Sequence, residues 1–395
     1  MTTHKQIEIP ATYMRGGTSK GVFFRLKDLP QQAQVAGKYR DQLLLRVIGS
    51  PDPYAKQIDG MGGATSSTSK TVIVSKSQVP EHDVDYLFGQ VAIDQPFVDW
   101  SGNCGNLSSA VGPFAIRQGL VDPERIPENG VCTVRIWQAN IGQTILADVP
   151  IVDGEVQELG DFELDGVTFP AAEITLSFCE KVEEDAAKVF PTGKLTEWLD
   201  VPEVGRFEVT MVQTGIPTVF LRAEDLGYTG TELQQDINND ANALDKLEKI
   251  RAYAALQMGL ISNISEAATR QHTPKIAFVA HAKDYTSSSG QAVLAKETDL
   301  LVRALSMGKL HHAMMGTAAI AIAVTANIPG TLLYQLRRST QGQKVTFGHP
   351  SGTLTVGADV IEQDGIWRMH KAIMSRSARV LMKGTVFVPD NFAQI

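Results

Sequence analysis

The stretch Ala313–Ile328, with the sequence AMMGTAAIAIAVTANI, is the most apolar part of the chain. It is sixteen residues long and carries no charged side chain; two histidines precede it and Pro329-Gly330 follows it. A helix needs about 20 predominantly apolar residues to cross a bilayer, so this segment is too short to be a membrane span. A helix that is apolar on every side is instead expected at the centre of a globular unit.

A second helix of small and apolar residues is predicted over Asn106–Gly119. Short runs rich in Val, Ile, Phe and Thr flank both helices and are bounded by Gly, Pro and Asp, a pattern typical of strands. Strands do not alternate strictly with helices, so a doubly wound parallel sheet is not predicted. The pattern also predicts a helix over Glu297–Ser306.

Four motifs of the first half of the chain recur in the second half in the same order. Lys70–Val74 resembles Lys275–Val279, and the other three pairs begin at Val22 and Val219, Gly102 and Gly308, and Gly142 and Gly352. The offsets rise slowly from 197 to 210 residues, which indicates a duplicated unit. We therefore predict an α+β fold with two halves, residues 1–185 and 186–395, each a sheet curled around one buried helix. The last strand could return to the first half.

The composition is that of an ordinary globular protein, with 395 residues, 43% hydrophobic and 20% charged. A net charge of −8 argues against a nucleic-acid partner, because such proteins usually carry a basic excess. Cys104, Cys132 and Cys179 are too few and too scattered for a disulfide framework, and no Cys-x-x-Cys pair suggests a zinc site. We expect a cytoplasmic protein, without a signal peptide or a membrane partner.

Cys104 lies in a glycine-flanked turn, Ser101–Asn106, at the predicted start of a helix. Free backbone N–H groups and the positive end of the helix dipole lie at such a position. Both stabilise a thiolate or bind a carboxylate. The alternative is a buried structural cysteine, and this is our interpretation of Cys132 and Cys179, which adjoin predicted strands.

A run rich in glycine and hydroxyl residues, Asp59–Lys70, ends just before an apolar strand. Its N–H and hydroxyl groups, Ser66 among them, can hold carboxylate oxygens. Beside the apolar strand Lys70 could be partly desolvated, which would lower its pKa towards use as a general base. A solvated lysine at the start of a strand is the alternative. The run is not a P-loop, because G-x-x-x-x-G-K-[ST] is absent.

Two further segments are candidates for ligand binding. Arg15–Gly21, RGGTSKG, predicts a hairpin whose glycines allow a close approach of a ligand and whose Arg15, Thr18 and Ser19 can bind carboxylates; a plain hairpin tip is the alternative. In the second half, His311 and His312 precede the apolar helix. A histidine there can bind an anion or move a proton, or it is a capping or buried residue. No H-E-x-x-H motif is present, so no metal site is predicted.

These motifs together resemble the PrpF family, and the resemblance covers essentially the whole chain. It rests on Met14–Gly21, the glycine-rich run to Lys70, the Gly-Asn-Cys104-Gly-Asn turn, Met307–His312, Gly348–Gly352 and Ala378–Met382. The family contains 2-methylaconitate cis–trans isomerases of the methylcitrate route of propionate breakdown. Its superfamily is that of diaminopimelate epimerase and proline racemase. The resemblance implies that superfamily's duplicated fold, with an active site between the two halves.

Racemizing members of this superfamily use two cysteines, one at each central helix. The chain matches the first at Cys104, but Met314, Met315 and Gly316 stand at the second position, which disfavours a two-thiol racemase. The resemblance instead implies an isomerase without a cofactor, in which Lys70 is the base and Cys104 shapes the site or shares the proton transfer. The groups that would bind the substrate's carboxylates are Arg15, Thr18, Ser19, Ser66, Gly105, Asn106, His311, Gly316, Thr317 and Ser351.

The implied partner is a small tricarboxylate, with a functional link to an aconitase-like methylcitrate dehydratase. A homodimer is expected only from the general frequency of dimers. Within the same family, a 4-oxalomesaconate tautomerase or a methylitaconate isomerase would carry out the same allylic proton shift on a different acid. Alternatives of another class are a non-catalytic accessory protein of an aconitase-like iron–sulfur enzyme and a duplicated binding protein.

Overall fold

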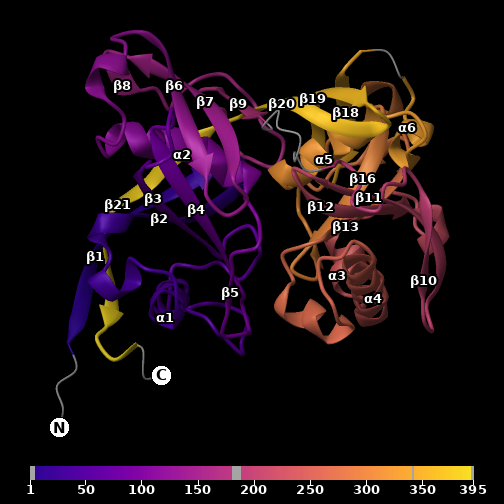
Figure 1. The fold of residues 1–395 in the computed structure, drawn as a ribbon, viewed down its shortest axis with the longest axis horizontal. Helices are drawn as coiled ribbons and strands as arrows, with labels where there is room; N and C mark the ends of the chain where they lie inside the picture. Colours follow the sequence, from indigo (N-terminus) through magenta and orange to yellow (C-terminus); the bar gives the residue numbers. More distant parts are fainter. Residues whose placement is uncertain (1–4, 180–187, 340–341, 393–395) are drawn as a thin grey trace. The chain divides into compact units, whose positions relative to one another are not determined.

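The computed structural model describes residues 5–179, 188–339 and 342–392. It divides the chain into two compact units (Figure 1). Unit 1 comprises Met1–Glu163, Phe169–Leu176 and Arg376–Ile395, and unit 2 comprises Leu164–Thr168 and Ser177–Ser375. The boundary predicted between residues 185 and 186 lies outside the described residues. No helix in the described part of the chain is long and apolar enough to cross a membrane.

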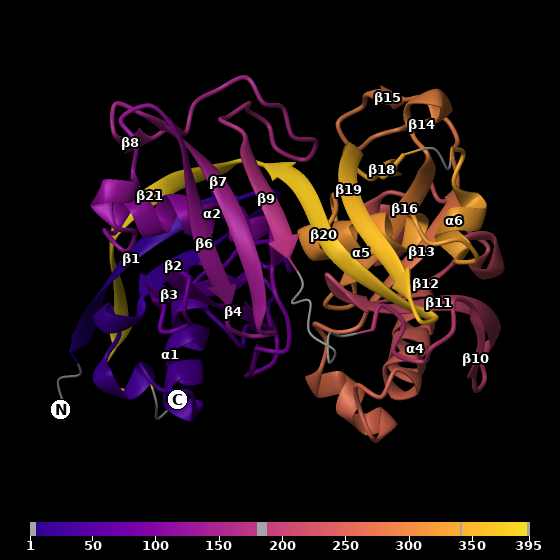
Figure 2. The same cartoon turned by 45° about the horizontal axis from the view of Figure 1, so that its top comes forward.

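Unit 1 is built on a mixed sheet with the strand order β21-β1-β2-β3-β4-β6-β7. The bounds are Gln6–Gly16 for β1, Ser19–Arg25 for β2, Lys70–Lys76 for β3, Val84–Val91 for β4, Gly130–Gln138 for β6, Gln143–Val152 for β7 and Ala378–Pro389 for β21. β2 and β3 are parallel, as are β4 and β6. β21, the last strand of the chain, pairs with the full length of β1 (Figure 2).

The shorter elements of unit 1 are α1 (Lys38–Ile48), β5 (Val98–Asp99), β8 (Glu155–Val156) and 3-10 helices at Leu26–Asp28, Gln31–Ala33 and Pro123–Arg125. α2 (Gly105–Arg117) lies against the inner face of the sheet, in contact with β1, β2, β6, β7 and β21. Every residue from Gly105 to Ile116 is buried. At Gly112 an added Cβ would lie 2.7 Å from a methyl of Val149. Small residues therefore allow the helix to be enclosed, and the predicted buried central helix is confirmed.

Unit 2 repeats this topology. The strands β11 (Gly205–Thr214), β12 (Ile216–Arg222), β13 (Lys275–His281), β16 (Leu300–Ser306), β18 (Lys344–His349) and β19 (Gly352–Gln363) follow the order of β1, β2, β3, β4, β6 and β7. The parallel pairs recur at the same places, β12 with β13 and β16 with β18. This recurrence is the structural form of the duplication seen in the sequence.

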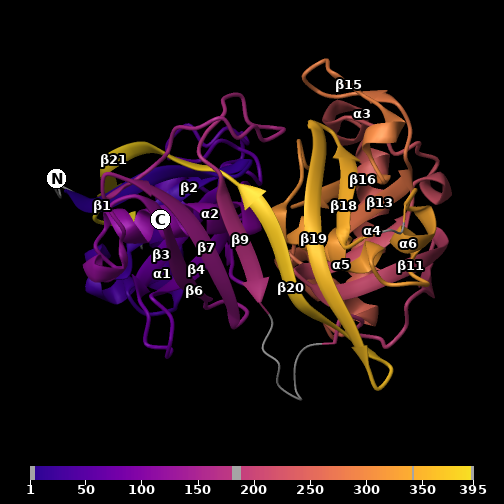
Figure 3. The same cartoon turned by 90° about the horizontal axis from the view of Figure 1, so that it is seen from above.

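The remaining helices are α3 (Gln234–Asn238), α4 (Ala241–Gln257), α6 (Leu332–Leu336) and 3-10 helices at Glu224–Leu226, Ile264–Thr269 and Ala295–Glu297. The remaining strands are β10 (Glu197–Val201), β14 (Tyr285–Thr286), β15 (Ala292–Val293), β17 (Lys309–Leu310) and β20 (Ile366–Arg376). β9 (Ile174–Cys179) runs from unit 1 into unit 2. The central helix of unit 2 is α5 (Gly316–Ala326), and all of its residues are buried. α5 contacts β11, β12, β18 and β19. Two of these strands, β18 and β19, are labelled beside it in Figure 3.

The helix predicted over Glu297–Ser306 is wrong. Most of this segment is β16, and all seven of its residues are buried. A short, continuously apolar run has no periodicity that separates a buried strand from a buried helix. Pairing with β13 and β18 on its two sides decides the outcome.

Candidate active site

Lys70 and Cys104 lie side by side in unit 1. Lys70 is the first residue of β3, and Cys104 is the N-cap residue of α2. Their side chains interact electrostatically, and they are only 5% and 8% exposed, respectively. Burial lowers the pKa of Lys70, while the neighbouring Cys104 side chain acts in the opposite direction. The pair thus places a buried amine beside a thiol at a helix N-terminus.

Gln90 holds the Lys70 amine in position. The two residues are partners across β3 and β4, and Lys70 Nζ donates a 2.5 Å hydrogen bond to Gln90 Oε1. The Gln90 amide is fixed in turn, because Nε2 donates to the carbonyls of Ser66 (3.3 Å) and Ser69 (3.0 Å). The glycine-rich run that precedes Lys70 therefore contributes to the site through its backbone. Sequence reasoning missed Gln90, whose place follows only from the β3–β4 register.

Arg376 is a second buried cation near Cys104. Its Nε donates to Asn106 Oδ1 at 3.0 Å, and it interacts electrostatically with Cys104. Burial lowers the pKa of Arg376 to about 10, and the electrostatic interaction with Cys104 opposes this change. The guanidinium therefore remains charged at neutral pH and places a buried positive charge near the start of α2. Sequence reasoning missed Arg376, because nothing local connects the end of β20 with the start of α2.

The β1–β2 hairpin closes against the first turn of α2. Gly16 pairs with Ser19 across the hairpin, and Thr18 Oγ1 accepts a 3.0 Å hydrogen bond from Asn106 Nδ2. Gly17 has a φ of +51°, and a Cβ there would lie 2.4 Å from Asn106 Oδ1. A side chain at Gly17 would therefore displace the Asn106 amide. This close approach is a structural reason for the glycines of the motif.

Arg15 and Ser19 belong to the same hairpin. Arg15 Nη1 donates to the carbonyls of Gly17 (3.1 Å) and Ser377 (2.9 Å), so its guanidinium ties the hairpin to the chain entering β21. Ser19 is buried. Arg15, Thr18, Ser19, Ser66, Gly105 and Asn106 all lie in unit 1 with Lys70 and Cys104.

Buried polar groups also surround the backbone of Cys104. Its carbonyl accepts hydrogen bonds from the hydroxyls of Tyr86 (3.3 Å) and Ser108 (3.1 Å). Asn103, the preceding residue, is buried, and within the described residues its Nδ2 has no hydrogen-bond partner. Sequence reasoning did not single out these residues. The Asn103 amide is a donor that a bound anion could use.

Unit 2 presents the same helix entry without the thiol. α5 begins at Gly316 with Met315 as its N-cap residue, so Met315 takes the place that Cys104 has in unit 1. The close approach of a hairpin glycine to the helix also recurs. A Cβ at Gly16 would lie 2.7 Å from the Asn106 carbonyl oxygen in unit 1, and a Cβ at Gly215 would lie 2.4 Å from the Thr317 carbonyl oxygen in unit 2. The structure therefore aligns Cys104 with Met315, and the match of Gly102 with Gly308 made from the sequence is out of register. A thioether carries no acidic proton, so Met315 cannot take the role of a thiol in proton exchange.

His311, His312 and Ser351 lie near this entry in unit 2. The two imidazole rings are stacked 4.7 Å apart, and burial lowers the pKa of His312. His311 Nδ1 accepts a 3.1 Å hydrogen bond from the Ala313 N–H, which assigns the proton of a neutral ring to Nε2. This contact lies in the turn before α5 and is not a helix cap, because the N-cap residue Met315 has no side-chain cap hydrogen bond. Ser351 Oγ donates to the His312 carbonyl at 2.5 Å.

A family model described as PrpF protein matches residues 6–389. The chain belongs to the PrpF family. It is 69% identical over 97% of its length to a protein of Shewanella oneidensis named 2-methyl-aconitate isomerase, and covers 98% of that protein. It is 66% identical over 99% of its length to a protein of Cupriavidus necator of the same name, and covers all of it.

The fold of this PrpF-family chain is similar to a crystal structure of a methylitaconate-delta-isomerase, with 36% sequence identity and a TM-score of 0.73. The match covers 98% of this chain and 97% of the other chain. A probable proline racemase from Agrobacterium radiobacter, at 13% identity and a TM-score of 0.54, shares the fold. The predicted epimerase-like fold is therefore confirmed, and so is the resemblance on which the prediction of the family rested.

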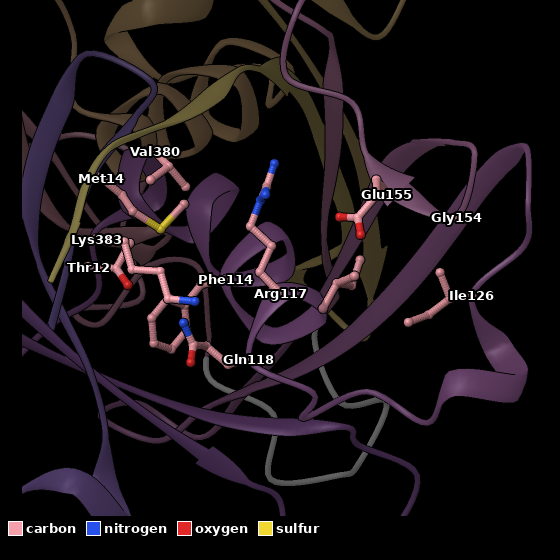
Figure 4. A pocket seen from close by; sticks show the side chains of 11 residues that line it. Thr12, Met14, Phe114, Arg117, Gln118, Ile126, Gly154, Glu155, Val380 and Lys383 are labelled. Carbon is pink, nitrogen blue, oxygen red and sulfur yellow. The ribbon is translucent and has the colours of Figure 1, made fainter. Parts of the chain in front are cut away.

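A separate cavity of about 360 Å³ lies elsewhere in unit 1 of this PrpF-family chain (Figure 4). Its lining includes Phe114, Arg117, Glu155 and Lys383. Arg117 is the last residue of α2, so the cavity lies at the opposite end of the helix from Cys104. Among the described residues no cluster of His, Cys, Asp and Glu has the arrangement of a metal site.

Proposed function

We propose that the protein is a cofactor-independent isomerase that converts 2-methyl-trans-aconitate to 2-methyl-cis-aconitate and also acts on aconitate. One structural observation carries the proposal: a buried Lys70–Cys104 pair at the anion-binding end of α2. The full-length relatives named 2-methyl-aconitate isomerase, at 66% and 69% identity, support the choice of substrate.

Lys70 is the proposed base. An unsaturated tricarboxylate has a methylene whose protons are acidified by a carboxylate and by the adjacent double bond. The neutral amine takes one of these protons, and the electron pair left behind spreads into a dienolate. The former double bond is then a single bond about which the molecule rotates. Return of the proton from the Lys70 ammonium gives the other isomer and restores the amine.

Cationic and N–H groups around Lys70 stabilise the dienolate. The positive end of the α2 dipole, at Gly105 and Asn106, and the charge of Arg376 favour negative charge at the start of this helix. Cys104 shapes this end of the site or shares the proton transfer. Arg15, Thr18, Ser19 and Ser66 in unit 1, and His311, Gly316, Thr317 and Ser351 in unit 2, are proposed to hold the carboxylates.

The proposed setting is propionate catabolism by the methylcitrate cycle in the cytoplasm. There the protein would use the product of an aconitase-like methylcitrate dehydratase and act as a homodimer. The names of the two relatives support the pathway, and the absence of a disulfide framework from the sequence supports the compartment.

The test is a panel of four acids given to the purified protein in D2O and followed by proton NMR. We expect the highest kcat/KM with 2-methyl-trans-aconitate, some turnover of trans-aconitate, and exchange of the methylene proton with solvent. Faster turnover of 4-oxalomesaconate or methylitaconate would instead favour the tautomerase or methylitaconate isomerase alternatives. Binding without turnover of any acid would favour an accessory protein.

A further inference from the structure

Lys275 in unit 2 is the structural counterpart of Lys70 and has no role in the proposal above. Val22 pairs with Thr71 in unit 1, and Val219 pairs with Ile276 in unit 2. Lys70 immediately precedes Thr71, and Lys275 immediately precedes Ile276. Each lysine is also the first residue of its strand. The duplication has therefore kept a lysine at one position while it replaced the thiol.

The Lys275 amine lies in a buried polar cluster. Nζ donates to Ser306 Oγ at 3.1 Å and lies 3.2 Å from His272 Nδ1. The three residues are only 2% to 3% exposed. The next five residues of β13, Ile276–Ala280, are apolar and buried. Burying an ammonium group is unfavourable even when it is hydrogen-bonded, so packing alone does not explain a lysine at this position.

The cluster lies at the end of unit 2 where α5 begins. Lys275 pairs with Thr218 across β13 and β12, and Thr218 is three residues beyond Gly215, whose position abuts the Thr317 carbonyl. The N-terminus of α5 carries free backbone N–H groups and partial positive charge. An ammonium and a helix N-terminus at the same end of a unit form a suitable environment for an anion.

We propose that Lys275, supported by Ser306 and His272, is a carboxylate-binding cation contributed by unit 2. Its ligand is one carboxylate of a di- or tricarboxylate. The identification of that ligand as the substrate rests on the proposed function. A role in binding fits better than proton transfer, because Met315 replaces the thiol that accompanies Lys70 in unit 1.

The test is Lys275→Met, which keeps the length of the side chain and removes its charge. The probe is tricarballylate, a saturated tricarboxylate that cannot isomerise, titrated calorimetrically. Loss of a hydrogen-bonded charge should weaken its Kd about 10- to 100-fold. KM for trans-aconitate should rise in parallel while kcat stays within about threefold. The matched control is Lys309→Met, an exposed lysine of the same unit, which should bind as the wild type does.

An unchanged Kd in folded Lys275→Met overturns the inference. So does a loss confined to kcat, which would make the amine a proton carrier. If Lys275→Met does not fold, Ser306→Ala keeps the ammonium and removes one partner; it should weaken the Kd about 2- to 10-fold, and an unchanged Kd overturns the inference.

The wild-type protein separates this inference from the proposed function. If it binds tricarballylate in a Lys275-dependent way but isomerises no acid of the panel, the proposed function fails and the anion site stands. If it isomerises 2-methyl-trans-aconitate and Lys275→Met binds tricarballylate normally, the anion site fails and the proposed function stands.

Discussion

Replacing Lys70 with methionine is expected to remove activity while leaving the fold intact. The substitution keeps a chain of similar length at a position that is 5% exposed and deletes only the amine. A general base contributes about 10²- to 10⁴-fold to the rate. Because Lys70 both removes and returns the proton in the proposed reaction, kcat should fall at least about 100-fold, which corresponds to about 2.7 kcal/mol in the barrier.

The stability of Lys70→Met follows from two opposing effects. Loss of the 2.5 Å hydrogen bond leaves Gln90 Oε1 without its donor, which costs about 1–3 kcal/mol. Removal of a buried ammonium offsets that loss, since burial of the charge is itself unfavourable by several kcal/mol. We therefore expect a free energy of unfolding close to that of the wild type or higher, measured by urea denaturation with circular dichroism.

The pH dependence gives a second measurement on Lys70. Burial lowers the pKa of Lys70 in the folded protein below the ordinary 10.5, so the unfolded chain binds this proton more tightly than the folded protein does. The buried charge therefore lowers the stability of the fold, and this penalty is fully present at pH values below the folded-state pKa. The penalty disappears as pH rises towards 10.5. Any stability advantage of Lys70→Met should therefore be largest at low pH. In the wild type, kcat/KM should rise with pH through a limb below 10.5, as the amine loses its proton.

The matched control is Lys76→Met, an exposed lysine at the other end of β3, for which rate and stability should stay close to wild type. Initial rates with trans-aconitate are followed by NMR or chromatography. A folded Lys70→Met protein that keeps more than a tenth of wild-type kcat would refute the assignment of the base. A loss of more than about 4 kcal/mol in unfolding free energy would show instead that the amine is mainly structural, since such large losses mark a broken buried network.

Two further substitutions test the surroundings of the thiol. Arg376→Met should lower kcat/KM for trans-aconitate about tenfold, because a buried cation near Cys104 stabilises the negative charge of the proposed dienolate. Arg376→Lys should restore part of the rate, and equal rates in all three proteins would contradict this. Gly17→Ala should lower kcat/KM and stability, because the new Cβ displaces Asn106. Gly154→Ala, with φ +73° but no atom within 4 Å of the added Cβ, measures the backbone strain alone; equal losses would show that Asn106 is not disturbed.

The parts of the fold and site that sequence predicts are those with a local signal. An apolar run of sixteen residues between breakers predicts α5, and a cysteine between glycines before a helix marks the N-terminus of α2. Lys70 stands out because it separates a hydroxyl-rich run from an apolar strand. Each of these signals lies within one segment, so no knowledge of the tertiary structure is needed.

The parts that sequence does not predict depend on pairing between distant segments. Gln90 becomes part of the site only through the register of β3 and β4. Arg376 reaches Asn106 only because the chain re-enters unit 1 before β21. The burial of Lys275 has the same origin, because Ser306 comes to face it through the pairing of β13 with β16. Local patterns contain no information on these contacts.

The asymmetry between the two units suggests how a duplicated fold can favour isomerisation over racemisation. A racemase must deliver a proton to the face opposite the one from which it was removed, and therefore needs an acid–base group on each side of the carbon. Both groups proposed for proton transfer, Lys70 and Cys104, belong to unit 1, whereas unit 2 has Met315 at the helix entry and a lysine proposed to bind a carboxylate. If proton transfer is confined to unit 1, removal and return use the same groups. Inversion at carbon is then disfavoured, and rotation in the dienolate is the change that remains.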